Sequence, residues 1–179
     1  MPNTLKLGTL CVAVSVFGLT ALASAHGAKN PPLAPAPVPT EIAAAKKVFI
    51  SNGGGANLEN IYHVTVVSGG TDRSYNQFYA AMKAWGRYDL VPSPADADLV
   101  FEISWSLPGS DLKLPTGRLR LVILDPKTRV KLWAIIEYAQ GAMRLSNRDK
   151  NFDQAMDAVV DRLKTLVEPP ATAVKSAAP

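Results

Sequence analysis

The most constraining feature of the chain is a strict alternation of side-chain type between Asp98 and Leu107. Large apolar residues take every second position, and most of the positions between them are small or polar. The first set is Leu99, Phe101, Ile103, Trp105 and Leu107, and the second is Val100, Glu102, Ser104 and Ser106. Successive side chains of a strand point to opposite faces of the sheet, so this pattern predicts a strand with one buried and one wet face.

Two further apolar runs, Arg118 to Leu124 and Arg129 to Ala139, flank the segment 125–128, Asp-Pro-Lys-Thr. Proline at its second position cannot take the positive φ of a two-residue type I′ turn, so we predict a four-residue loop built on a type I turn. This register pairs Leu124 with Arg129, Ile123 with Val130, Leu121 with Leu132, and Leu119 with Ala134. The predicted apolar face is Leu119, Leu121, Ile123, Val130, Leu132, Ala134, Ile136 and Tyr138.

Two segments show the three- and four-residue spacing of amphipathic helices. The first begins at Asp72 or Ser74 with a polar cap, ends at Gly86, and spaces Tyr75, Phe78, Tyr79, Met82 and Trp85 along one face. The second runs from about Asn151 to Val167 and aligns Phe152, Met156, Val159, Val160, Leu163, Leu166 and Val167. Asp153 and Asp157 suit the positive end of its dipole. The apolar stripe of the second helix fits a core, and a ligand groove is the alternative.

Three shorter segments complete the predicted elements. The run 46–51 reads as a strand that stops at Asn52-Gly53-Gly54-Gly55, the run 61–68 as a second strand, and Tyr88 to Val91 as a short strand. The sequence therefore predicts an α+β fold with a mixed, largely antiparallel sheet in β-α-β-β-β-β-α order and two helices packed on it.

The first 25 residues have the three parts of a secretory signal peptide: Lys6, an uncharged run from Leu7 to Leu22, and Ala23-Ser24-Ala25. We expect cleavage after Ala23 or Ala25 and an exported protein, periplasmic or secreted; a retained anchor is the alternative. Residues 26–45, with five prolines between 31 and 39, predict a flexible linker, 46–168 a single domain, and 169–179 a disordered tail.

Charge and cysteine content narrow the function classes. Without Lys6 the chain has 18 Lys and Arg against 15 Asp and Glu, a net charge of +3 that is not clustered as phosphate backbones require. We therefore expect no nucleic-acid partner, and contact with a membrane only through the signal peptide. Cys11, the single cysteine, lies too early for lipid modification, and its loss with the leader leaves no disulfide or thiolate ligand.

Familiar catalytic motifs are missing from the sequence. For the residues that could take part in catalysis or metal binding, a structural role is the ordinary interpretation. The glycine loop 52–57 lacks the spacing of a nucleotide fingerprint. His63 could act as a general base beside Ser51, Ser68 or Asp72, and His26 with His63 could chelate copper. Glu102 and Glu137 could form a glycosidase pair, but both are expected on the wet face. We predict no catalytic residue, cofactor or metal.

The element order carries a resemblance to a known group. Ala95-Asp96-Ala97-Asp98-Leu99-Val100, the stretch 78–88 and the stretch 124–133 resemble bacterial envelope domains of unknown function, many of them lipoproteins, and the amino-terminal domain of TolB. The chain departs from the lipoprotein members because it lacks a cysteine at the end of the leader. The resemblance implies a fold and a compartment, and no activity.

The predicted hairpin also suggests an interaction surface on the wet face of the sheet. Arg120 falls opposite Trp133 in the expected register, and the candidate surface comprises Arg118, Arg120, Lys131, Trp133 and Ile135. We predict a non-catalytic module that binds an unknown envelope protein there, unless the early helix packs on this patch and makes it core. The alternatives are an apolar-ligand or lipid carrier, with a cavity beside Met156 and Val160, and a hydrolase of unfamiliar type.

Overall fold

The computed structural model describes residues 36–56, 65–108 and 116–168. Its helices are α1 (Thr40–Ala44), α3 (Arg73–Trp85) and α4 (Leu145–Val167), with one 3-10 turn, η1 (Pro94–Asp96). Its strands are β1 (Lys47–Asn52), β2 (Asp89–Leu90), β3 (Leu99–Ser106), β4 (Gly117–Leu124) and β5 (Lys131–Ala139). The signal peptide, the first part of the linker, His26, His63 and the tail from 169 lie outside the described residues.

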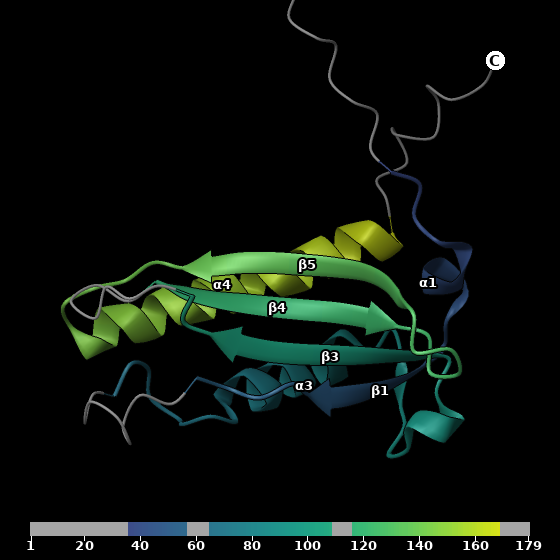
Figure 1. Ribbon diagram of the computed structural model, residues 1–179, viewed down its shortest axis with the longest axis horizontal. Helices are drawn as coiled ribbons and strands as arrows, with labels where there is room; N and C mark the ends of the chain where they lie inside the picture. The colour runs from purple at the N-terminus through teal and green to yellow at the C-terminus, as the bar shows by residue number, and fades with distance from the viewer. Residues whose placement is uncertain (1–35, 57–64, 109–115, 169–179) are drawn as a thin grey trace, which may run out of the picture. The chain divides into compact units, whose positions relative to one another are not determined.

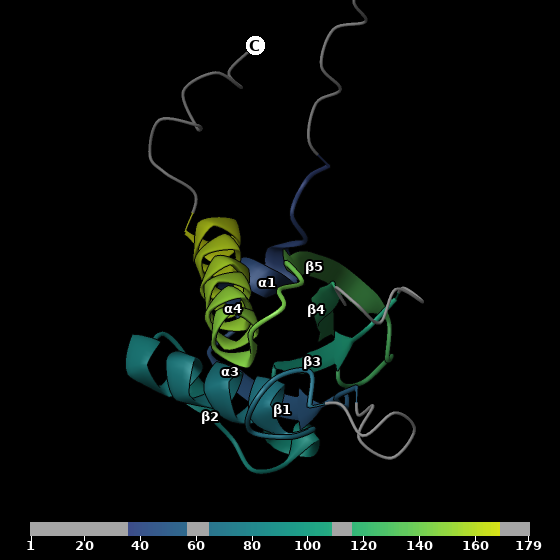
Figure 2. The same ribbon diagram turned by 90° about the vertical axis from the view of Figure 1, so that its left-hand side faces the viewer.

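The five strands form one mixed sheet in the order β2-β1-β3-β4-β5. β1 pairs in parallel with β2 and β3, and β4 pairs antiparallel with β3 and β5. Figure 1 views this sheet with α3 and α4 behind it, and Figure 2 shows both helices on the same side. The α+β fold with helices packed on a mixed sheet is confirmed. No helix in the described ranges has the length and hydropathy to cross a bilayer.

The alternation in β3 orients its side chains as predicted. The helix-covered side, here called the inner face, carries Leu99, Phe101, Ile103 and Trp105, and β4 adds Leu119, Leu121 and Ile123. Each of these residues is at least 95% buried. Phe78 and Met82 of α3 and Phe152, Val159 and Leu163 of α4 pack against them. Burying each such side chain contributes about 1.5–3 kcal/mol, so this layer is the main source of stability.

The register of the predicted hairpin is wrong by three positions. Leu121 pairs with Ile135 rather than with Leu132, and Leu119 pairs with Glu137. An odd shift exchanges the two faces of a strand, so Ile135 and Ala139 are buried while Ile136 and Tyr138 point outward. Val130 lies exposed in the loop instead of in the predicted apolar face.

Local hydrogen bonds in the β4–β5 loop explain the shift. The carboxylate of Asp125 accepts from the backbone N–H groups of Lys127 and Thr128, and the carbonyl of Asp125 accepts from Arg129, which has φ +60°. These contacts extend the loop to residue 130. An irregularity in the ladder beside Ile123 and Leu124 then brings both Leu132 and Trp133 against the core.

One of the two predicted helices begins earlier than expected, and the other ends at the expected residue. α4 begins at Leu145, six residues before Asn151, and has no acidic residue in its first turn. Its acidic residues at 149 and 153 are held by Arg73 rather than by the helix dipole. α3 ends as predicted at Gly86, whose φ of +69° suits a residue without a side chain. Ile42 of α1, which the sequence assigned to the linker, is fully buried in the core.

The predicted strand 61–68 lies partly outside the described residues, and its described end is not a strand. Residues 65–68 form a bend that leads into a turn, and Val66 and Val67 are buried there. Arg148 of α4 binds the carbonyls of Thr65 and Val66 and also those of Ala142 and Met143. One guanidinium therefore ties this turn segment to the connection between β5 and α4.

Candidate functional site

The side of the sheet opposite α3 and α4, here called the outer face, is not covered by either of these helices. The strand pairings define its rows of adjacent side chains. These rows are Phe49, Val100, Leu124 and Lys131; Ser51, Glu102, Val122 and Ala134; Ser104, Arg120 and Ile136; and Ser106, Arg118 and Tyr138. In Figure 1 this face is turned toward the viewer.

Apolar and basic groups share the outer face. Tyr138 is 54% exposed and Ile136 is 37% exposed, although both belong to a regular strand. Val122 and Val100, which also lie on this face, are buried. Of the charged residues on this face, Lys47, Arg118, Arg120 and Lys131 are basic, and Glu102 and Asp89 are acidic. The outer face thus combines aliphatic and aromatic side chains with an excess of basic side chains.

The predicted five-residue surface does not form a single patch, because its register was wrong. Arg118, Arg120 and Lys131 lie on the outer face as expected. Ile135 is only 5% exposed and Trp133 packs against the core, so both belong to the inner side. Arg120 is opposite Ile136 rather than Trp133. The sequence missed Ile136 and Tyr138 because the predicted register directed them inward.

The competing expectation that the early helix covers the basic patch is also wrong. α3 packs on the inner face, with Phe78 against Phe101 at a ring separation of 6.4 Å. Glu102 lies on the outer face, whereas Glu137 lies on the inner side and its carboxylate is 2.7 Å from Arg162 of α4. The two carboxylates therefore sit on opposite faces of the sheet and do not form the glycosidase pair.

The serine and aspartate residues considered as partners of His63 have structural roles of their own. Ser68 donates its hydroxyl to Asp149 at 2.7 Å, and Asp72 accepts from the amide of Asn52 at 2.8 Å. Ser51 lies on the outer face of β1. His63 and His26 lie outside the described residues, so the catalytic and copper hypotheses remain predictions.

A network around Arg73 was not predicted from the sequence. Arg73 is 12% exposed, contacts Asp149 and Asp153 through separate nitrogens, and lies 4.5 Å from the centre of the Phe152 ring. Burial disfavours the charged form of Asp149, but hydrogen bonds from Ser68 and Arg73 outweigh it and hold its pKa below the usual value. This network fastens the start of α3 to α4 and has the character of a structural clamp.

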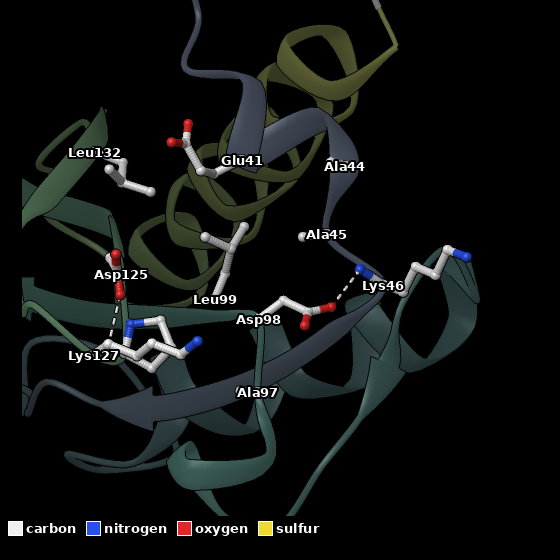
Figure 3. A pocket seen from close by; sticks show the side chains of 11 residues that line it. Glu41, Ala44, Ala45, Lys46, Ala97, Asp98, Leu99, Asp125, Lys127 and Leu132 are labelled. Carbon is white, nitrogen blue, oxygen red and sulfur yellow. Dashed lines mark hydrogen bonds between the residues drawn. The ribbon is translucent and has the colours of Figure 1, made fainter.

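A pocket of about 360 Å³ lies where α1, the start of β3 and the β4–β5 loop meet (Figure 3). Leu99, Leu132 and several alanines supply apolar walls, and Glu41, Asp98 and Asp125 supply carboxylates. The carboxylate of Asp98 accepts from the backbone of Lys46 and Lys47, which lowers its pKa. The Asp125 pKa is lowered by the backbone N–H groups of Lys127 and Thr128. Both aspartates therefore already fasten the backbone around the pocket.

Two grooves border α4. One of about 450 Å³ lies against α3 and is lined by Ala81, Ala84, Trp85, Asp157, Val160, Asp161 and Lys164. Met156 and Val160, the residues expected beside a lipid cavity, are both buried in the core. The other groove, of about 150 Å³, lies against β5 and is lined by Glu137, Tyr138, Gln140, Asn151, Gln154, Ala155 and Ala158.

Comparison with known proteins gives a distant likeness in fold. No protein-family model matches the sequence, and no curated protein matches it. A DUF330 protein from Xanthomonas campestris has 9% identity and a TM-score of 0.46, over 75% of this chain and 90% of that chain. A PelC dodecamer from Paraburkholderia phytofirmans has 12% identity and a TM-score of 0.39, over 70% and 88% respectively.

A homologue of a neuraminyllactose-binding hemagglutinin from Helicobacter pylori is similar at the same level, with 11% identity and a TM-score of 0.38, over 74% of this chain and 87% of that chain. These matches are too distant to transfer a ligand, a partner or an assembly. A likeness to the amino-terminal domain of TolB is not shown by them and stays a prediction.

Proposed function

We propose that the chain is an exported, non-catalytic module that binds a partner protein of the cell envelope through its outer face. The leader in residues 1–25 supports export. The observation that carries the binding proposal is the composition of the outer face, where Ile136 and Tyr138 stand exposed beside Arg118 and Arg120. Aromatic and arginine side chains are enriched where proteins bind one another.

The charge of the outer face defines the partner. Four basic side chains against two carboxylates, with both arginines beside Ile136 and Tyr138, favour a partner surface that combines acidic and apolar residues. Two copies of this face would oppose like charges, which disfavours self-association by direct stacking. Arg118 is held near Ser106 by a hydrogen bond of 3.3 Å, so part of the basic surface is already ordered before binding.

Photo-crosslinking tests this proposal. It is done in the cell that produces the protein, with a photoreactive residue at a single position of the chain. A photoreactive phenylalanine replaces Tyr138 on the outer face or, as a matched control, Tyr79, which is 39% exposed on α3. We expect a discrete adduct from position 138 and not from position 79. Arg120→Glu is expected to abolish that adduct, whereas Lys150→Glu, the same charge change at an exposed position of α4, leaves it unchanged.

Two outcomes contradict the proposal. Equal adducts from positions 138 and 79 mean that the outer face has no preferred partner. An adduct from position 138 that persists unchanged in Arg120→Glu means that the basic side chains do not take part in binding.

A further inference from the structure

β5 is an edge strand of unusual length for an open edge. It pairs with β4 on one side, and within residues 36–56, 65–108 and 116–168 no strand pairs with its other side. Its nine residues, Lys131–Ala139, carry no proline. Proteins ordinarily protect such an edge, because its free N–H and C=O groups accept any extended chain. The groups that cover this edge of β5 therefore bear on whether an extended chain can pair with it.

Two side chains of α4 cap backbone carbonyls on this edge. Arg162 donates to the carbonyl of Ile136 at 3.3 Å, and Asn151 donates to the carbonyl of Gln140 at 2.8 Å. Backbone groups on a strand alternate between its two sides, so Ala134 and Tyr138 direct their N–H and C=O groups to the same open edge as Ile136. Tyr138 lies between the two caps.

The cap at Ile136 can be removed at little cost. Its 3.3 Å distance is at the long end of the hydrogen-bond range, and the Arg162 side chain is 64% exposed. Its second contact, 2.7 Å to Glu137, survives a small movement away from the carbonyl. Arg162 thus covers the carbonyl of Ile136 but can move away from it while keeping its contact with Glu137.

The small groove beside β5 lies along this same edge. Its volume of about 150 Å³ is below that of sites for drug-sized ligands and suits one side chain. Ala155 and Ala158 supply small apolar surface there, and Asn151 and Gln154 add amides. A strand added to β5 would direct alternate side chains toward α4, where this groove could take one of them.

The other side chains of an added strand would project on the outer face. There Ile136 and Tyr138 are their nearest neighbours, and Arg120 and Arg118 are paired with these two residues on β4. Acidic side chains at those positions would meet the basic groups of the outer face. A second β5 would supply none, since its own outward residues include Ala134, Ile136 and Tyr138.

We propose that the partner contributes an extended segment that pairs with β5 as a sixth strand. Its outward side chains are acidic, and one inward aliphatic side chain enters the groove over Ala155 and Ala158. Main-chain hydrogen bonds then supply affinity, and the groove and the arginines supply specificity. This inference rests on the proposed function and adds the form and chemistry of the partner.

The probe is a fluorescent, acetylated octapeptide of alternating glutamate and leucine, titrated with the purified protein and followed by anisotropy. Its control is the same peptide N-methylated at alternate residues, which cannot complete the strand ladder. Ala134→Pro removes an edge-facing N–H, and Ala134→Val keeps it at the same exposed position. Ala158→Met fills the groove, and Arg162→Ala removes the cap.

We expect the parent and Ala134→Val to bind the probe, and Ala134→Pro and Ala158→Met to bind it about tenfold more weakly. Arg162→Ala is expected to bind it severalfold more tightly. Circular dichroism checks the fold of each variant, and the N-methylated peptide, expected not to bind, keeps the test valid if Ala134→Pro does not fold.

Equal binding of both peptides, no binding of either, or unchanged binding by a folded Ala134→Pro would overturn strand addition. The proposed function fails separately. If crosslinking from position 138 depends on Arg120 but is unaffected by Ala134→Pro, the outer face binds a partner without an added strand.

Discussion

The two faces of this sheet are made by the same strands and have opposite roles. The inner face of β3 and β4 is an uninterrupted apolar layer sealed by α3 and α4. The outer face of the same strands mixes apolar residues with serine, glutamate and arginine and has no cover among the described elements. The inner face therefore maintains the fold, and changes on the outer face should alter binding with little effect on folding.

Two arginines show the same contrast at the level of single side chains. Arg73 is mostly buried between α3 and α4 and bonded to two carboxylates. Arg118 lies on the outer face, where it donates a hydrogen bond to Ser106. A charge that is buried must keep its partners, whereas one beside water can exchange them, so only the second kind is available to a binding partner without a large cost.

Removing an aromatic ring from each face should give the largest difference. Phe152→Ala empties a fully buried site in contact with Trp105 and is expected to lower the free energy of unfolding by about 3–5 kcal/mol. Tyr138→Ala, at a half-exposed site, is expected to cost less than about 1 kcal/mol. Urea denaturation of both variants measures the two values, and similar losses would mean that the outer face is covered in solution.

The arginine comparison should give an intermediate difference. Arg73→Met leaves two carboxylates without their partner, and because Asp153 is half-exposed we expect a loss of about 2–3 kcal/mol rather than the full cost of a buried charge. Arg118→Met should change stability by no more than about 0.5 kcal/mol. The same denaturation experiment compares them, and an Arg73→Met variant as stable as Arg118→Met would show that the clamp contributes nothing.

The smallest expected effect concerns acid. The folded pKa of Asp149 lies below its unfolded value, so its stabilising contribution is complete above the unfolded pKa, near 4, and is lost as the pH falls through the folded pKa. Asp149→Asn should therefore lower the melting temperature at pH 7 and reduce its further decline toward pH 3. Asp157→Asn, on the exposed side of α4, is the control.

Melting curves recorded between pH 7 and pH 3 check this expectation. A parallel decline of the parent and Asp149→Asn would place the acid sensitivity in other carboxylates, for which Asp98, with its lowered pKa, is the next to substitute.

Much of the fold follows from local patterns in the sequence. The alternation of β3 and the helical spacing around Phe78 and Phe152 each reflect a repeat that one element imposes on its own residues. Such repeats predict which side of an element is buried. They do not report which residue of the next strand lies opposite, and for this reason the candidate surface was only partly correct.

The length of the loop between β4 and β5 could not be predicted from such local patterns. The sequence Asp125-Pro126-Lys127-Thr128 indicated a turn, but the length of the turn depends on how Asp125 and Arg129 satisfy the backbone around them. The network around Arg73 also could not be predicted from the sequence, because its members at 68, 73, 149 and 153 are brought together only when α3 packs beside α4.

The sequence by itself determined the α+β class, the identity of the main strands and helices, and the buried side of β3 and β4, because burial must match the period of each element. Only the tertiary structure decided the register of β5. A shift by an odd number of residues exchanges its faces, placing Ile135 under α4 and leaving Ile136 and Tyr138 beside the arginines of β4. The composition of the outer face follows from that shift, whereas the open edge follows from the place of β5 at the end of the strand order.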